Sequence, residues 1–378
     1  MSVDKARDEF LFLDSVRGAA AVVVVASHLV AGFYPAMHFP SLPPWVRVWY
    51  SGDFAVQLFF ALSGFVLSLS FVRGGGIESL RSAAVRRYFR LAVPITASVL
   101  VSYSLHYLGL YFNREAAAAT GQEVDSWLGR WFGFSPSLPR AVDEGLYKSL
   151  FAHNLGRTYN AVLWTMQAEF AGSFFVFAFL ALFGGLRRRW VVYAALAAVF
   201  LRQEWPWASA FLAGVALCDA LGGRLPARCR PGTGAVLVLA GLFLGGMTPE
   251  WVRASVGWLP RRPLQFHMAA GAALLLLGVI QAGWLRAALL ARPLVFLGRL
   301  SFPLYLVHIL VELSLGCYVF LACRNAGCEP GTAFAAAAAA TLVVSLLVAW
   351  VGALTVEPLS IYLGKRVYTA FRPAGLPV

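Results

Sequence analysis

Charged residues are scarce in this sequence: Asp, Glu, Lys and Arg make up only 13% of the 378 residues, and hydrophobic residues make up 60%. A soluble globular domain is about half apolar and about a quarter charged. The shortage of charge therefore excludes a soluble domain with one membrane anchor. It predicts an integral membrane protein that crosses the lipid bilayer many times.

Acidic residues are the scarcer charged kind, with 18 Asp and Glu against 31 Lys and Arg, which gives a formal net charge of +13. A nucleic-acid-binding protein would gather its basic residues on one face among aromatic residues. Here they are scattered over the loops between apolar stretches, as is typical of membrane proteins. We therefore expect a lipid bilayer, and no nucleic acid, as a partner.

Cysteine is also rare, and its five copies show no spacing typical of a metal site, so we expect no metal. Cys323 and Cys328 flank a short loop. They are either a disulfide, if that loop faces an oxidising compartment, or two free thiols. The sequence also lacks an internal repeat, a heptad pattern and a second soluble segment. We therefore predict one transmembrane domain over residues 1–378.

Most of the sequence consists of long apolar stretches. With a window of about 20 residues there are ten of them. They cover residues 12–36, 53–73, 88–110, 160–184, 189–203, 205–222, 233–248, 264–283, 294–321 and 331–357. These stretches predict an all-α fold, a polytopic integral membrane helix bundle with about ten transmembrane helices. The fifth stretch is short, and a re-entrant pair formed by the fifth and sixth stretches is the alternative.

The distribution of Lys and Arg predicts how these spans are oriented. With both termini in the cytoplasm, the inside segments hold more basic residues than the outside segments do, as the positive-inside rule requires. The one long outside segment then runs from about residue 111 to residue 159. We expect it to form a lid or short interfacial helices.

The first apolar stretch carries three polar side chains that share one helical face. Arg17 and His28 are eleven positions apart, which is about three turns, and Asp14 precedes Arg17 by three positions. Charged groups in a spanning helix are costly and usually face the bundle interior on a functional path. The alternative is a structural Asp14–Arg17 pair with a histidine bonded to a neighbouring helix.

The predicted topology gives each polar side chain a depth in the membrane. These depths form two layers of polar side chains. The cytoplasmic layer consists of Arg17, Arg87, Arg90 and Arg299. The middle layer consists of His28, Ser63, Glu169, Tyr305 and His308. Guanidinium groups bind phosphate through paired hydrogen bonds, so the first layer predicts a phosphate-bearing ligand. The second layer offers acyl transfer an imidazole base and a carboxylate to orient it.

Each of these residues also has a structural interpretation. The cluster at residues 86–90 is consistent with a positive-inside flank, and Ser63 with a notch for helix packing. Glu169 and His308 are consistent with satisfied buried groups, and Tyr305 with packing. The functional interpretation is favoured because these unusual residues fall at two consistent depths.

Five segments in order carry a family resemblance. They are LDSVRGAAAVVVVASH (Leu13–His28), FFALSGFVLS (Phe59–Ser68), RRYFRLAVP (Arg86–Pro94), LWTMQAEFAGS (Leu163–Ser173) and LGRLSFPLYLVH (Leu297–His308). With them the chain resembles the membrane acyltransferase 3 family, which O-acetylates carbohydrates and other acceptors using acetyl-CoA. The fourth segment and the closing Val356–Lys365 look most like fungal members, which implies an endomembrane or the plasma membrane.

The resemblance implies a role for each matching residue. His28 would be the catalytic base, with Glu169 assisting at the reaction centre. The donor acyl-CoA would be bound by Arg17, Arg87 and Arg90, and the cytoplasmic layer of arginines adds Arg299 as a donor-binding residue. The shared pocket would be lined by Tyr305 and His308, and the helical spacing and depth of Asp14 and Ser63 add these two residues to it.

The expected activity is O-acyl transfer from cytosolic acetyl-CoA to a hydroxyl of a carbohydrate, a glycan or a secondary metabolite. Transfer is either direct, with His28 as general base, or passes through an acetyl-His28 intermediate. A membrane transporter of an anionic solute is the competing interpretation, and an inactive lipid-binding scaffold is a third. The absence of a visible inverted repeat favours the enzyme over the transporter.

Overall fold

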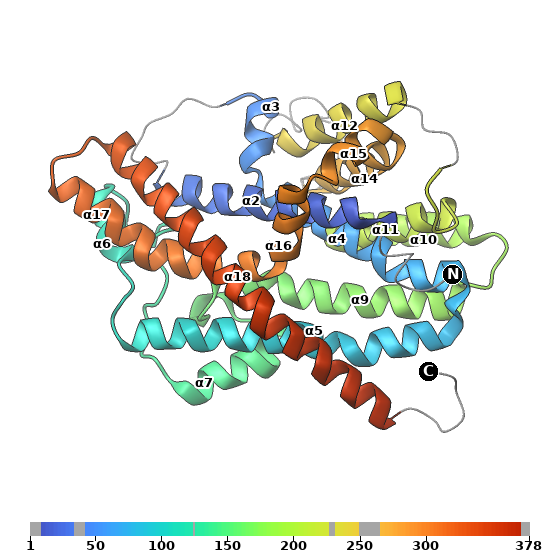
Figure 1. Ribbon diagram of the computed structural model, residues 1–378, viewed down its shortest axis with the longest axis horizontal. Coiled ribbons are helices and arrows are strands. Elements are labelled where there is room, and N and C mark those ends of the chain that lie inside the picture. Colours follow the sequence, from blue (N-terminus) through green and yellow to red (C-terminus); the bar gives the residue numbers. More distant parts are fainter. Residues whose placement is uncertain (1–8, 34–41, 124, 227–230, 249–264, 372–378) are drawn as a thin grey trace. The chain divides into compact units, whose positions relative to one another are not determined.

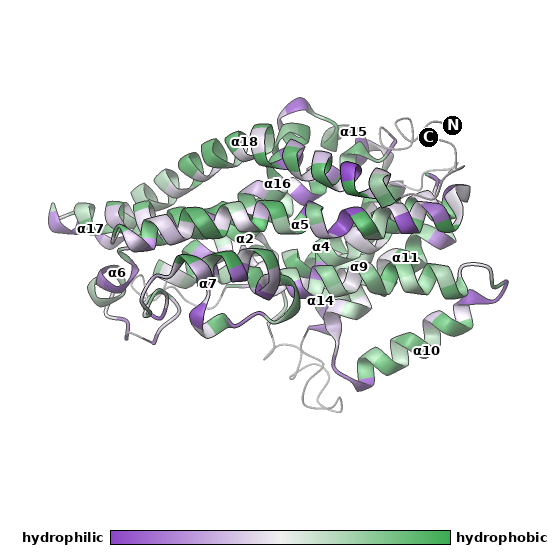
Figure 2. Cartoon of the chain, turned by 90° about the horizontal axis from the view of Figure 1, so that it is seen from below, coloured by the Kyte–Doolittle hydropathy of each residue, from purple (hydrophilic) through white to green (hydrophobic). Residues whose placement is uncertain are grey.

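The structure is a computed structural model that describes residues 9–33, 42–123, 125–226, 231–248 and 265–371. Within these ranges the chain forms helices and turns and no β-strand. Figure 2 shows that α10 (Arg189–Arg202) and α18 (Pro330–Phe371) are mainly apolar along their length. The predicted fold class, an all-α membrane helix bundle, is confirmed.

The longer helices follow the predicted apolar stretches (Figure 1). They are α2 (Leu11–Phe33), α4 (Gly52–Ser70), α5 (Gly76–Tyr107), α9 (Trp164–Phe183), α10, α11 (Pro206–Ala220), α12 (Pro231–Gly246), α14 (Phe266–Gln281), α16 (Arg292–Val311), α17 (Cys317–Asn325) and α18. The shorter elements are α3 (Pro44–Arg47), η2 (Val48–Tyr50), η3 (Phe71–Gly75), α6 (Asn113–Ala119), α7 (Leu138–Asp143), η4 (Glu144–Lys148), α8 (Ser149–Phe151), η5 (Leu155–Arg157), η6 (Ala161–Leu163), α15 (Gly283–Leu289) and η7 (Glu312–Gly316).

Five helical stretches of the described chain are long and apolar enough to cross a membrane. They are Leu11–Phe33, Gly52–Tyr107, Ala161–Phe183, Arg292–Asn325 and Pro330–Phe371. A sixth results if α14 and α15, bent by 94°, count as one span. The predicted number of ten spans stays a prediction, because α10, α11 and α12 have only 14, 15 and 16 residues.

The stretch Gly52–Tyr107 contains two of the predicted spans, and a break at Gly74 separates them. Gly74 has φ of 96° and Gly76 has φ of 59°, values that glycine adopts without the steric cost that a side chain would add. Gly74 interrupts η3 after the end of α4, and Gly76 begins α5, which accounts for two predicted spans within one helical stretch.

The chain forms two compact units, each assembled from three separate segments. The first unit comprises Met1–Val24, Leu42–Ala84 and Ala171–Arg299. The second comprises Val25–Ser41, Val85–Phe170 and Leu300–Val378. The prediction of one acyltransferase domain over residues 1–378 stays a prediction.

Small residues bring helices of the first unit into backbone contact. A Cβ atom at Gly64 of α4 would lie 2.2 Å from the carbonyl oxygen of Phe211 on α11. A Cβ atom at Gly214 of α11 would lie 2.0 Å from the carbonyl oxygen of Ala61. In membranes such small residues allow close helix packing. The packing interpretation of the Ser63 region is therefore supported at the glycine that follows Ser63.

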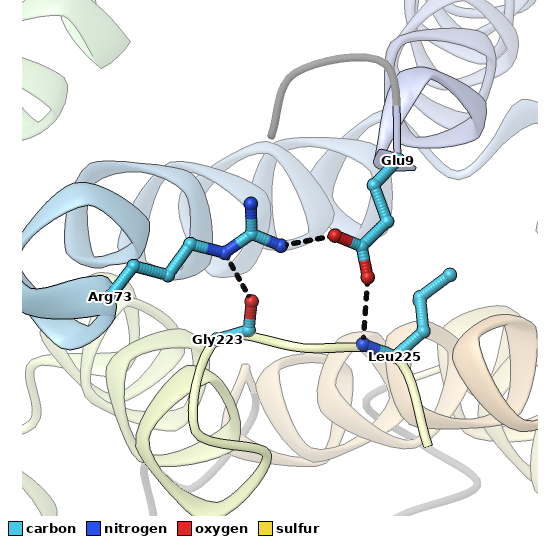
Figure 3. A network of polar contacts seen from close by, with 4 residues as sticks. All are labelled: Glu9, Arg73, Gly223 and Leu225. Atoms are coloured by element: carbon cyan, nitrogen blue, oxygen red, sulfur yellow. Dashed lines mark hydrogen bonds and ion pairs between the residues drawn. The ribbon is translucent and has the colours of Figure 1, made fainter. Parts of the chain in front are cut away.

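A polar network fastens the beginning of α2 within the first unit (Figure 3). Arg73 Nη2 lies 2.5 Å from Glu9 Oε2, and Arg73 Nε donates to the carbonyl oxygen of Gly223 over 2.6 Å. The backbone N–H of Leu225 donates to Glu9 Oε1 over 3.1 Å. Because charged hydrogen bonds are stronger than neutral ones, this network ties together Glu9, the break after α4 and the turn after α11.

The predicted outside segment contains short helices and belongs to the second unit. Gln122 Nε2 donates to the carbonyl oxygen of Gly32 on α2 over 2.7 Å. Asn113 Nδ2 donates to the carbonyl oxygen of Leu128 over 2.9 Å, and Ser102 on α5 donates to the carbonyl oxygen of Tyr159. These bonds hold the segment against α2 and α5.

Candidate active site

The core of the candidate site is a pair of histidines from α2 and α16, both in the second unit. His28 Nδ1 and His308 Nε2 are 2.8 Å apart, and the two rings are stacked with centroids 5.0 Å apart. The indole of Trp127 stacks on His28 at a centroid distance of 5.3 Å. His308 is fully buried, whereas His28 is partly exposed.

The hydrogen bonds of His308 determine which nitrogen of His28 carries a proton. His308 Nδ1 lies 3.0 Å from the carbonyl oxygen of Leu304, which can only accept. In a neutral His308 the hydrogen is therefore on Nδ1, and Nε2 is the acceptor. His28 must then donate from Nδ1, which leaves the lone pair on its Nε2. An imidazole in this tautomer can take a proton from a substrate at Nε2.

Tyr305 lies next to the histidine pair and is held by hydroxyl contacts. Its ring centroid is 6.0 Å from that of His308. Its hydroxyl is 2.7 Å from Thr165 Oγ1 and 3.1 Å from the carbonyl oxygen of Val162. Asn160 Nδ2 donates to the carbonyl oxygen of Leu306 over 2.8 Å. The start of α9 is thus fastened to the part of α16 that presents His308.

Glu169 forms an ion pair with Arg87 within the second unit. The sequence placed these two residues in different layers, with the carboxylate available to orient His28. In the structure the group bonded to His28 Nδ1 is His308, and the Glu169 carboxylate is engaged by Arg87. Arg90 lies three residues after Arg87 on the same helix and is half-buried. The catalytic role of Glu169 and the donor roles of both arginines stay predictions.

Glu312 is a residue of the site that the sequence reasoning missed. It is fully buried one turn after His308, and neither carboxylate oxygen has a hydrogen-bond partner among the described residues. A Cβ atom at Gly32 would lie 3.1 Å from Glu312 Oε1 and 3.4 Å from the Trp127 ring. A buried carboxylate without a partner is costly. The signal was present in the sequence, because Glu312 is an acidic residue inside a predicted span.

The remaining predicted site residues belong to the first unit. Arg17 Nη1 and Asp14 Oδ1 lie 3.5 Å apart, as the structural interpretation of this pair expects. A Cβ atom at Gly18 would lie 2.6 Å from the backbone nitrogen of Gly298. Arg17 directly precedes Gly18, and Arg299 directly follows Gly298. Both arginines therefore lie next to a close contact between two glycine backbones. Ser63 is buried on α4, and the roles of all four side chains at a donor site or pocket stay predictions.

Cysteine and acidic side chains are the groups that could form a disulfide or hold a metal ion. Cys323 and Cys328 are free thiols in the structure. Within the described ranges, no group of three or more His, Cys, Asp or Glu side chains is arranged to hold a metal ion. The expectation of metal-free chemistry stays a prediction.

A family model described as acyltransferase domain, of the acyltransferase 3 type, matches residues 10–353. The chain belongs to this acyltransferase family. The match covers nearly the whole chain, including both histidines and Glu312. The resemblance carried by the five sequence segments is therefore confirmed, and the protein is an acyltransferase with several membrane-embedded helices.

Two fungal relatives of this acyltransferase are similar at low identity. The O-acetyltransferase PaAT-1 of Phomopsis amygdali is 27% identical over 361 residues, covering 79% of this chain and 71% of the relative. The acyltransferase clz18 of Cochliobolus lunatus is 27% identical over 336 residues, covering 72% of this chain and 70% of the relative. No solved structure matches the chain significantly.

Proposed function

We propose that this acyltransferase transfers an acetyl group from acetyl-CoA to a hydroxyl group of a carbohydrate, a glycan or a secondary metabolite. The observation that carries the proposal is the hydrogen bond between His28 Nδ1 and His308 Nε2. With His308 Nδ1 bonded to Leu304, this arrangement leaves His28 Nε2 with its lone pair. Among the described residues, no protein group bonds to that nitrogen.

The proposed reaction begins when His28 Nε2 takes the proton of the acceptor hydroxyl. The acceptor oxygen attacks the thioester carbonyl of acetyl-CoA, the new C–O bond forms and the C–S bond breaks. The thiolate of CoA leaves and receives the proton from His28, so the imidazole is regenerated. During the step His28 is positively charged, and its Nδ1–H bond to His308 then becomes a stronger, charge-assisted bond. The face of Trp127 also stabilises the cation.

The donor is proposed to bind through Arg87 and Arg90, which lie one turn apart on α5. Guanidinium groups suit the phosphates of CoA because they bind them with paired hydrogen bonds. The ion pair with Glu169 would position the Arg87 side chain for this contact. Arg17 and Arg299 stay predicted contributors to donor binding.

The test is transfer of labelled acetyl from acetyl-CoA by the purified full chain, given a mixture of hydroxyl-bearing metabolites. We expect His28→Ala to lower the rate by about 100-fold to 10,000-fold, the usual contribution of a general base. His153→Ala is the matched control, because His153 lies between α8 and η5, outside the histidine pair.

Three results would contradict the proposal. Solute flux without label transfer would indicate a transporter. Normal cellular function of His28→Ala would indicate a scaffold. Equal losses of activity in His28→Ala and His153→Ala would show that the loss is not specific to the proposed base.

A further inference from the structure

A basic cavity lies in the segment between α5 and α9, outside the candidate active site. It has a volume of about 540 Å³. Its polar lining consists of Arg114, Arg130, Arg140, Arg157 and Ser135. All of these residues belong to the second unit. Four guanidinium groups around one cavity repel one another unless an anion is present.

None of the four arginines forms an ion pair within the described parts of the chain. Nearby acidic residues are engaged elsewhere. Asp143 pairs with Lys148 over 2.6 Å, and Glu144 is buried and accepts hydrogen bonds from Thr158 and Tyr159. The positive charge of the cavity is therefore not neutralised by these neighbours.

The backbone at Phe132 and Gly133 lies close to the Arg114 guanidinium at the cavity. A Cβ atom at Gly133 would lie 2.5 Å from Arg114 Nη2, so a larger residue at this position would displace that guanidinium. Phe132, just before Gly133, has φ of 59°, which is unfavourable for a residue with a side chain. Its ring is stacked on Tyr111 with centroids 3.6 Å apart, which holds this conformation. Such strain persists only where surrounding contacts fix it.

The cavity is connected to the histidine pair through aromatic side chains. The Arg130 guanidinium lies over the Trp131 ring at 4.7 Å. Trp131 packs edge-on against Trp127 at 6.3 Å, and Trp127 stacks on His28. Three contacts thus separate an arginine of the cavity from the proposed catalytic base. The aromatic contacts that begin at Arg130 therefore end on the ring of His28.

We propose that this cavity binds an anionic group, a carboxylate or a phosphate, on the acceptor that receives the acyl group. Arginine binds both groups with paired hydrogen bonds, and Ser135 adds a hydroxyl donor. The acceptor class is thus narrowed to hydroxyl-bearing molecules that also carry a negative charge. The proposal rests on the acyl-transfer function proposed above.

The test compares a charged and a neutral probe, glucuronate and glucose, with the purified full chain in phosphatidylcholine nanodiscs. Calorimetric titration measures binding, and labelled acetyl-CoA measures transfer to each probe. We expect glucuronate to bind and glucose to bind far more weakly, with the difference reduced by added salt. Arg130→Gln and Arg157→Gln should each weaken glucuronate binding by about tenfold to a hundredfold, the value of a lost charged hydrogen bond.

Two matched variants sharpen the test. Arg157→Lys keeps the charge and loses the paired hydrogen bonds, so we expect its glucuronate affinity to lie between those of the native protein and Arg157→Gln. Arg47→Gln removes one positive charge on α3, outside the cavity, and should bind glucuronate as the native protein does. Arg130 and Arg157 are exposed, so their replacement is expected to leave the fold intact.

Several outcomes would overturn the proposal. One is equal binding of glucuronate and glucose, and another is an unchanged glucuronate affinity in both Gln variants. Stabilisation by phosphatidylglycerol nanodiscs that is lost in the Gln variants, with no glucuronate binding, would assign the cavity to a lipid headgroup. Charge-dependent glucuronate binding without acetyl transfer from acetyl-CoA to any acceptor would instead contradict the proposed function and leave an anion site without that role.

Discussion

The carbonyl oxygen of Leu304 determines, through His308, which nitrogen of His28 carries the hydrogen. It fixes the hydrogen of His308 on Nδ1, and His308 in turn fixes the hydrogen of His28 on Nδ1. His308 is thus a positioning residue that acts through His28. The sequence placed both histidines at one depth, but only the rotation of α16 relative to α2 decides which nitrogen atoms meet.

Replacing His308 tests this positioning role. We expect His308→Ala to lower kcat by about tenfold to a hundredfold while the KM for acetyl-CoA changes little, because binding of the donor is not affected. His308→Gln, whose amide oxygen can accept the His28 hydrogen, should recover part of the lost kcat. Steady-state acetyl transfer is the measurement. Equal kcat values for the two variants, or a change confined to KM, would contradict the role.

Two buried glutamates near this site are expected to respond in opposite ways to loss of charge. Glu312 has no hydrogen-bond partner among the described residues, so Glu312→Gln removes a costly charge and should leave thermal stability equal or higher. Glu169→Gln breaks the pair with Arg87 and leaves a partly buried guanidinium uncompensated, so stability should fall. Thermal unfolding in detergent measures both. If Glu312→Gln lowered the unfolding temperature as much as Glu169→Gln does, the Glu312 carboxylate would have a partner and the prediction would be wrong.

Among the connecting elements, η4 and the segment between η5 and η6 are fixed to each other by one buried carboxylate. Glu144 accepts hydrogen bonds from Thr158 Oγ1 at 2.5 Å and from the backbone N–H of Tyr159 at 3.0 Å. Burial raises the pKa of Glu144 from 4.5 to about 7, although those hydrogen bonds and the charge of Lys148 act to lower the pKa. Sequence patterns predicted helices in this segment but not this contact, because it joins η4 to an extended backbone segment 14 residues away.

The raised pKa of Glu144 predicts a stability that depends on pH. The folded protein binds the proton more tightly than the unfolded chain, so the contribution to stability is complete below about pH 4.5 and is lost as the pH rises through about 7. The loss is on the order of 3 kcal/mol. We expect thermal unfolding to occur at a lower temperature at about pH 8 than at about pH 5.

Glu144→Gln is the matching control for this pH dependence. Its amide oxygen accepts the same two hydrogen bonds without titrating, so the unfolding temperature should vary much less with pH. An equally steep dependence in Glu144→Gln would assign the effect to another group.

Across the complete chain, the sequence predicted more of the architecture than of the chemistry. Each predicted apolar stretch contains a helix in the described ranges, because hydrophobic length is a property of the local sequence. The family followed from five short segments. The pairing of Arg87 with Glu169, the bond between the histidines and the orphan carboxylate of Glu312 all depend on helix rotation and register, which composition does not specify.

The predicted orientation of the chain is open to a direct test. In sealed membrane vesicles whose cytoplasmic side faces outward, prepared from a variant whose five cysteines are replaced by serine, Arg188→Cys, between α9 and α10, should react with a membrane-impermeant maleimide. Leu155→Cys should react only after the membrane is permeabilised. Both positions are exposed, so accessibility is decided by the side of the membrane. The reverse labelling pattern would contradict cytoplasmic termini.

The stacking of Trp127 on His28 gives the protein an optical reporter of its own chemistry. A protonated imidazole quenches the emission of an adjacent indole more strongly than a neutral imidazole does. Each proposed proton transfer to His28 would therefore dim one of the 12 tryptophans. A stopped-flow trace of native emission, compared with that of Trp127→Phe, would then follow catalysis without any added dye.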